Sequence, residues 1–170
     1  YPGGLPKPFS NDPTQWIFHG HPDQNDSALH VAIIRLLGYR WPTELKKEME
    51  LAEKARKLII NCNNLFPFAD KDGIVCIPAV RGEMNAEQRL DNLLAAAYKG
   101  QWSTQKKSEL LSQVDHAGKS METWLRDKFF SQHCKLFHHR PFIWQIWDGL
   151  NDGFSALINY HKLNKKLLET

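Results

Sequence analysis

The sequence predicts a mainly α domain with a small β-sheet, an α+β fold in which a helical domain carries a C-terminal hairpin. The first observation is a helical spacing of apolar residues, most regular over 86–99. The second is a pair of aromatic and β-branched runs, 142–147 and 154–160, on either side of a turn sequence with two Asp-Gly or Asn-Asp-Gly signals. The third is the short β-branched run 74–77, which needs a partner strand that the hairpin can provide.

The helical segments can be placed from their spacing and end signals. We expect helices near 26–37, 44–61, 86–99, 105–114 and 120–130. The first is apolar nearly all round, so it belongs at the centre of the core. The third begins after Asn85, with Gln88 in the position that favours an N-terminal cap. The second is expected to bury one stripe, formed by Leu45, Met49, Ala52, Ala55 and Ile59.

Length and composition indicate one domain with an arm. The chain has 170 residues, 42% of them hydrophobic and 24% charged, with a net charge of +3. Residues 1–13 are rich in proline and glycine and are predicted to be an arm or linker, with a short helix starting after Asp12. Residues 14–170 are expected to form a single mainly helical domain. The chain opens without methionine and stops inside a predicted helix, so we expect a fragment of a larger chain.

Cysteine usage and hydropathy point to a cytoplasmic protein. The three cysteines are far apart and form no CxxC pair, which is typical of a reducing compartment. No apolar run approaches the ~18 residues that span a membrane, and the N-terminus lacks the apolar region of a signal peptide. We therefore expect no membrane partner.

Catalytic and cofactor motifs are missing from the sequence. It contains no GxGxxG, GxxxxGK[ST], GxSxG or HExxH pattern. Eight histidines raise the question of a metal site, but His138 and His139 are adjacent and would point to opposite faces of a strand. Asp148 and Asp152 flank the hairpin turn, where such side chains usually bond the backbone. We assign no catalytic, cofactor-binding or metal-binding residue.

The most informative segment is the stretch 128–147, which contains no acidic residue. Cations alternate there with aromatic side chains, a combination typical of nucleic-acid surfaces. The alternative is that the aromatic residues belong to the core and the cations surround it. The candidate nucleic-acid-binding residues are Lys135, His138, His139, Arg140 and Trp144.

The two tryptophans of this stretch are expected to differ in exposure. Trp144 and Trp147 lie three positions apart, so they point to opposite faces of an extended strand. We expect Trp147 to be buried beside the turn and Trp144 to be partly accessible.

The stretch HCKLFHHRPFIWQIWDGLNDGFSALINYHKLNKKLLE resembles a segment of very large bacterial DNA methyltransferase-type proteins. These are fused restriction-modification and phage-exclusion enzymes that carry an N6-adenine methylase domain. The stretches ALHVAIIRLLGYRWP, DGIVCIPAVRGE and MNAEQRLDNLLAAAYKGQWS are similar to parts of the same proteins. The resemblance extends from about Thr14 to the end of the chain.

The resemblance implies a segment outside the catalytic core. The family's Asn/Asp-Pro-Pro-Tyr/Phe motif and its S-adenosylmethionine loop do not occur here, so no catalytic or cofactor residue carries over. In the family, the region beyond the core is associated with target recognition, because an enzyme that flips a base must also grip the duplex. The implied function is non-catalytic engagement of double-stranded DNA. The parent enzyme would be an S-adenosylmethionine-dependent methyltransferase of restriction-modification or phage defence.

Two other functions remain as alternatives. The chain can be a structural or protein-interaction domain whose aromatic hairpin packs on the remaining domains of the parent polypeptide. A small metal-dependent nuclease is the third alternative, and it has the least support because no metal-ligand spacing is present.

Overall fold

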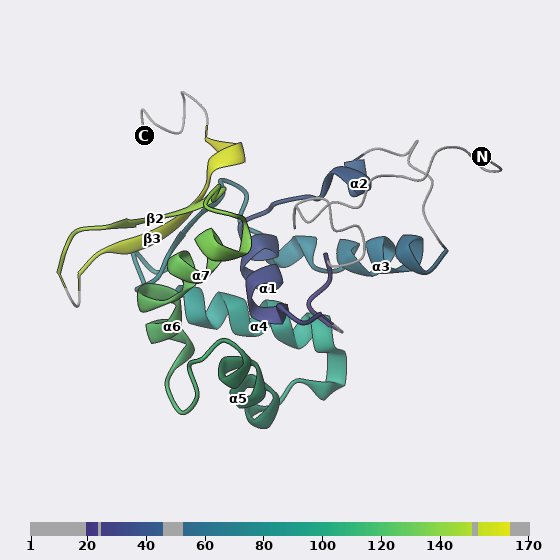
Figure 1. The fold of residues 1–170 in the computed structure, drawn as a ribbon, viewed down its shortest axis with the longest axis horizontal. Helices are drawn as coiled ribbons and strands as arrows, with labels where there is room; N and C mark the ends of the chain where they lie inside the picture. The colour runs from purple at the N-terminus through teal and green to yellow at the C-terminus, as the bar shows by residue number, and fades with distance from the viewer. Residues whose placement is uncertain (1–19, 24, 46–52, 151–152, 164–170) are drawn as a thin grey trace.

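The computed structural model describes residues 20–23, 25–45, 53–150 and 153–163. It shows a mainly helical α+β fold, in which helices surround a central helix and a small antiparallel sheet lies at one side (Figure 1). This confirms the predicted fold class. Among the described residues, the buried apolar side chains form a hydrophobic core that joins the helices to the sheet.

The helices have the following bounds: α1 Ala28–Leu36, α2 Pro42–Leu45, α3 Glu53–Asn63, α4 Ala86–Tyr98, α5 Thr104–Gln113, α6 Met121–Asp127 and α7 Phe129–Leu136. Helix α1 is central, and every one of its residues is buried. Its position confirms the prediction from its largely apolar sequence. Helix α4 begins as predicted, because the side chain of Asn85 accepts a hydrogen bond from the Gln88 backbone N–H at 2.8 Å.

The sheet has three short antiparallel strands in the order β1-β3-β2. They are β1 Ile74–Cys76, β2 Ile143–Trp147 and β3 Ser155–Asn159. Leu157 in the central strand pairs with Val75 on one side and with Gln145 on the other. The predicted pairing of the isolated run 74–77 with the C-terminal hairpin is therefore confirmed.

The predicted helix at 120–130 is wrong in its length. The chain breaks at Lys128 (φ −125°, ψ −29°), so α6 ends at Asp127 and a separate helix, α7, continues to Leu136. The extension follows from burial, because Phe129, His133 and Phe137 recur every four residues and are all buried.

The predicted buried stripe of the helix at 44–61 is wrong at Leu45, whose exposed fraction is 61%. Its neighbour Glu44 points inward instead and forms an ion pair with the buried Arg35, whose guanidinium also donates to the Gly20 carbonyl at 2.6 Å. A buried cation needs such partners, so α2 turns its acidic residue to the core. Met49 and Ala52, like the predicted arm and the short helix after Asp12, lie outside the described residues.

Candidate nucleic-acid interface

Four basic residues of the acid-free stretch lie close together in the sequence where α7 ends. Lys135 lies in the last turn of α7, and His138, His139 and Arg140 follow the helix directly. We call these four residues the basic turn. All four side chains are exposed. His138 and His139 lie in this turn and not on a strand, which corrects the geometry used in the sequence argument against a shared metal.

The backbone of the basic turn is closely fixed. The N–H of His139 donates to the Cys134 carbonyl at 2.7 Å, and the N–H of Arg140 donates to the Phe137 carbonyl at 3.0 Å. His138 and His139 have φ values of 53° and 62°, in the left-handed region that residues other than glycine rarely adopt. Two such residues in succession cost about 1–2 kcal/mol each, so the surrounding packing must hold them.

Buried His133 of α7 provides that packing. Its Nε2 accepts hydrogen bonds from the backbone N–H groups of Phe142 and Ile143, at 3.3 and 3.2 Å. These two groups lie where β2 begins, so His133 ties the chain that follows the basic turn to the helix that precedes it. Burial, with a smaller contribution from nearby His30, lowers the pKa of His133 to about 3. His133 is therefore neutral at pH 7 and does not add to the positive charge of the stretch.

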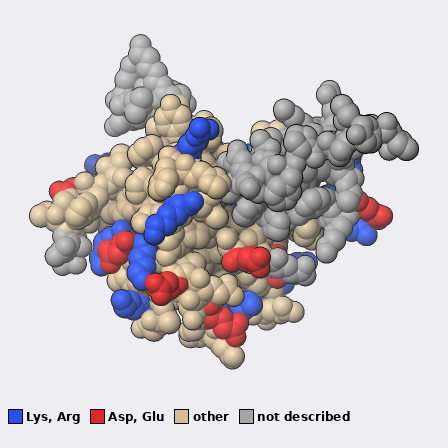
Figure 2. Space-filling view, in the orientation of Figure 1, with Lys and Arg blue, Asp and Glu red and all other residues tan. Residues whose placement is uncertain are grey.

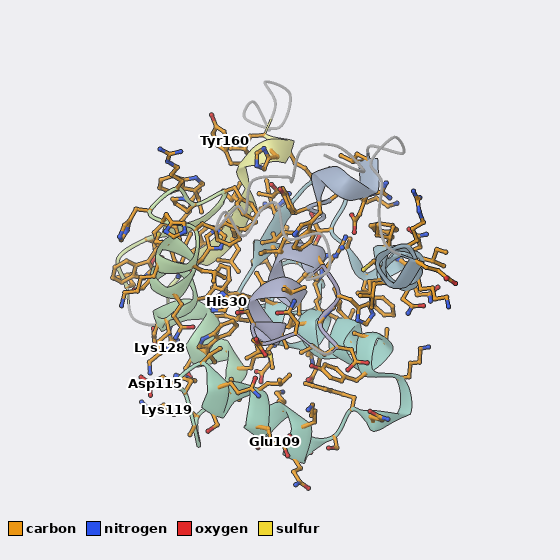
Figure 3. The ribbon with its side chains drawn as sticks, turned by 45° about the vertical axis from the view of Figure 1, so that its right-hand side comes forward. His30, Glu109, Asp115, Lys119, Lys128 and Tyr160 are labelled. Carbon is orange, nitrogen blue, oxygen red and sulfur yellow. The ribbon has the colours of Figure 1, made fainter. Side chains whose placement is uncertain are left out.

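Most aromatic side chains of the stretch belong to the core. Phe129 stacks between the rings of His30 and His133, at centroid distances of 5.4 and 5.5 Å, and Phe137 and Phe142 meet edge to face at 4.7 Å. His30 lies among the helices in the interior (Figure 3). The alternative interpretation of these aromatics is thus correct for Phe129, Phe137 and Phe142.

Trp144 is the aromatic residue that stays accessible near the basic turn. It lies on β2 with 47% of its surface exposed, and its ring contacts Phe130 of α7 at a centroid distance of 5.6 Å. This confirms the expected partial exposure. It lies four positions after Arg140 in the sequence, which is about 13 Å in an extended chain.

Trp147 is not buried, contrary to the prediction, because 56% of its surface is exposed. Its indole N–H donates to the Leu150 carbonyl at 3.0 Å, within the turn of its own hairpin. The physical reason is the length of the hairpin, whose turn end extends past the helices, so that packing from the core ends before Trp147 (Figure 1).

Several cations elsewhere in the described part are paired with acids. Ion pairs join Arg89 to Asp70 and Lys107 to both Glu87 and Asp91. On the face drawn in Figure 2, basic and acidic side chains lie side by side in the lower part, whereas two basic groups higher up stand apart from acidic ones in this view. Lys128 opens the acid-free stretch, but its Nζ lies 3.9 Å from the Asp115 carboxylate, far from Tyr160 at the base of the hairpin (Figure 3).

The basic turn differs from those cations in its charge environment. Among the residues that the structure describes, no carboxylate forms an ion pair with Lys135 or Arg140. The structure therefore brings Lys135, His138, His139 and Arg140 together, with Trp144 about four residues further along the strand. Such a group can bind anions, since Lys135 and Arg140 are exposed cations that pair with no described carboxylate and can contact phosphates.

Sequence reasoning missed α7 and the role of His133. The signal was present in the spacing of Phe129, His133 and Phe137, which continues one helical face for two turns. Sequence alone does not separate a buried neutral imidazole, such as that of His133, from an exposed charged one.

Asp148 acts as the turn former that the sequence predicts. Its carboxylate accepts hydrogen bonds from the backbone N–H groups of Leu150 and Phe154, at 3.0 and 2.7 Å. Asp152 lies outside the described residues. In the described ranges, no cluster of three or more histidine, cysteine or acidic side chains is arranged to hold a metal ion.

Comparison of the chain with protein-family models, with curated proteins and with solved structures gives no match. In the part of the chain that the structure describes, no helix has the length and apolar character needed to cross a membrane.

Proposed function

We propose that this chain is a non-catalytic, DNA-engaging segment of a bacterial N6-adenine DNA methyltransferase-type protein. The observation that supports DNA contact is the basic turn, because Lys135 and Arg140 are exposed cations that pair with no described carboxylate. The resemblance of the sequence supports the methyltransferase setting. In that setting the protein works in the cytoplasm, and the remaining domains of the polypeptide supply the catalytic motif and bind S-adenosylmethionine.

The proposed contact is with the phosphate backbone of double-stranded DNA. Cations and backbone amides on phosphates fix the position of a protein on the duplex but do not read its sequence. Lys135, His139 and Arg140 make these contacts, and the hydrogen bonds of His133 hold the turn in place for them. Trp144 offers an aromatic face further along the strand.

The salt dependence of DNA binding tests this proposal. Each phosphate contact contributes roughly 0.9 to the slope of log affinity against log salt concentration. Arg140→Ala is expected to lower that slope by about this amount and to weaken binding to all duplexes alike. The measurement is fluorescence anisotropy of a labelled duplex at several salt concentrations.

Lys119→Ala is the matched control, because it also removes one exposed cation but lies beside Asp115, away from the hairpin base (Figure 3). It is expected to keep the wild-type slope. If Arg140→Ala and wild type bind with the same affinity and the same slope, the basic turn does not contact DNA.

A separate measurement tests the assignment to a non-catalytic segment. Because the sequence lacks both the cofactor loop and the catalytic motif, titration calorimetry with S-adenosylmethionine is expected to give no binding heat. Saturable binding would show that the segment has been assigned to the wrong part of the enzyme.

A further inference from the structure

The turn end of the β2–β3 hairpin carries a group of exposed apolar side chains. We call Ile146, Trp147, Leu150 and Phe154 the hairpin tip; their exposed fractions are 50, 56, 65 and 44%. Single exposed apolar residues are normal on a protein surface, but neighbouring ones mark sites of interaction. Ile146 and Trp147 are adjacent on β2, so the group extends over both faces of the strand.

The backbone beside the tip is also open. The Asp148 N–H donates to the Phe154 carbonyl at 3.1 Å and the Tyr160 N–H to the Phe142 carbonyl at 2.8 Å, so even-numbered residues of β2 bond to β3. The N–H and C=O groups of Gln145 and Trp147 therefore point to the outer edge of the sheet. Among the described residues outside the sheet, none forms a hydrogen bond with these backbone groups.

The same edge is closed at the other end of β2. There the N–H of Ile143 donates to Nε2 of His133, and α7 packs against the strand. The available edge thus begins at Gln145 and continues to the turn. An exposed edge of this kind is a template for an additional strand.

The turn beside the hairpin tip has a negative charge, unlike the basic turn. Residues 141–160 contain two aspartates and no lysine, arginine or histidine. The hydrogen bonds from Leu150 and Phe154 lower the pKa of the Asp148 carboxyl group, so it is ionised at neutral pH. Phosphates of a nucleic acid are repelled by such a surface, whereas lysine and arginine side chains are attracted.

A second copy of this chain fits the edge poorly. Two-fold antiparallel pairing centred on Gln145 would place Ile143 opposite Trp147 of the other copy, but the Ile143 N–H already bonds to His133. Pairing centred on Trp147 would bring the two acidic turns close together, and like charges oppose association.

We propose that the outer edge of β2 and the hairpin tip bind an extended protein segment that alternates apolar residues with lysine or arginine. The segment adds to the sheet as a strand, so that its main chain bonds to Gln145 and Trp147 and its apolar side chains pack on the tip. Its cations lie near Asp148. This site and the basic turn share no residue. The proposed protein site is at the turn end of the hairpin, and the proposed DNA contact is at its base.

The probe for this site is a short synthetic peptide of alternating lysine and valine, with a glutamate–valine peptide as its charge-reversed counterpart. Titration of the full chain is followed by amide chemical shifts in NMR. The lysine–valine peptide is expected to shift the amides of Gln145 and Trp147 and to bind at least about tenfold more tightly than the glutamate–valine peptide.

Two variants at one position test strand addition. Gln145→Pro removes the outward N–H, which an edge strand tolerates, whereas Gln145→Val keeps it. Both variants lose the hydrogen bonds of the Gln145 side chain to the Arg126 carbonyl and to Ser155 Oγ. They differ from each other in the backbone N–H of residue 145, which faces the outer edge of the strand. Gln145→Pro is expected to abolish binding of the lysine–valine peptide, and Gln145→Val to preserve it.

A modified probe repeats the test without changing the protein. A lysine–valine peptide that is N-methylated on alternate residues cannot bond along a strand edge, and it is expected not to bind. The proposal is overturned if this peptide binds like the unmodified one, if both charge types bind equally, or if shifts concentrate on the basic turn. Dimerisation of the chain through β2, seen by sedimentation and lost in Gln145→Pro, would also overturn it.

Discussion

The two ends of the β2–β3 hairpin share the same strands but have opposite surroundings. At the base, Ile143 and Leu157 are fully buried and His133 anchors the chain. At the tip, Ile146 and Trp147 are half exposed and the turn that follows carries the Asp148 carboxylate. At both ends of β2, successive side chains point to opposite faces of the sheet. The difference shows that helices α6 and α7, which pack beside one end of the hairpin, decide which part of a strand becomes core (Figure 1).

The largest expected difference between the two ends is in the free energy of unfolding. Phe129 is fully buried between two histidine rings, so Phe129→Ala is expected to lower the stability by about 3–5 kcal/mol. Phe154→Ala removes the same side chain from the tip and is expected to change it by about 0.5 kcal/mol or less. Urea unfolding of both variants gives the comparison. A large loss in Phe154→Ala would mean that the tip is packed as well as the base.

Acid is expected to lower the free energy of unfolding through the buried histidines of the core. Burial lowers the pKa of His30 from 6.5 to about 4 and that of His133 to about 3. Between these pKa values and 6.5, the two histidines therefore bind protons in the unfolded chain but not in the folded chain. Stability is complete above pH 6.5, and as the pH falls towards about 4 it is lost by roughly 1.4 kcal/mol per pH unit for each of the two histidines.

Urea unfolding at several pH values measures this slope. His30→Gln removes one of four buried histidines whose pKa is lowered, the others being His21, His116 and His133, and is expected to reduce the slope by less than half. His139→Gln, in the exposed basic turn, is the control for replacing a histidine by glutamine outside the core. A pH-independent stability in wild type between neutral pH and pH 5 would contradict the burial of neutral imidazoles.

The sequence predicts the parts of the fold whose signals are local. The apolar sequence of α1, the cap at Asn85 and the turn residues of the hairpin each specify their own conformation, and all three are confirmed. The break at Lys128 and the burial of His133 depend on helices packing across the core. The prediction that Trp147 is buried is wrong for the same reason. Alternation separates the two faces of a strand but does not show how far along the strand the helices pack against it.

The candidate site is predicted only in part for a related reason. Sequence shows that cations and aromatic residues alternate over 128–147, and it identifies Lys135 and Arg140 as candidates. It does not show that Lys128 contacts Asp115, because the two residues are thirteen positions apart in the sequence with helix α6 between them. Pairing with acids that lie elsewhere in the chain decides which cations are available.

The smallest expected effect concerns the Asp148 carboxylate at the tip, which changes the local conformation and hardly the global stability. The N–H groups of Leu150 and Phe154 bond to its charged form, which is why its pKa lies below the ordinary 3.8. As the pH falls through that lowered pKa, the carboxylate gains a proton and these two bonds weaken. The amide resonances of Leu150 and Phe154 are therefore expected to titrate together, with a midpoint below 3.8, in an NMR pH series. In Asp148→Asn both amides should lose this titration while the amide of Ile143 at the base keeps its position. A midpoint at or above 3.8 would mean that the turn does not hold the carboxylate, and the negative charge of the tip would then lack a fixed position.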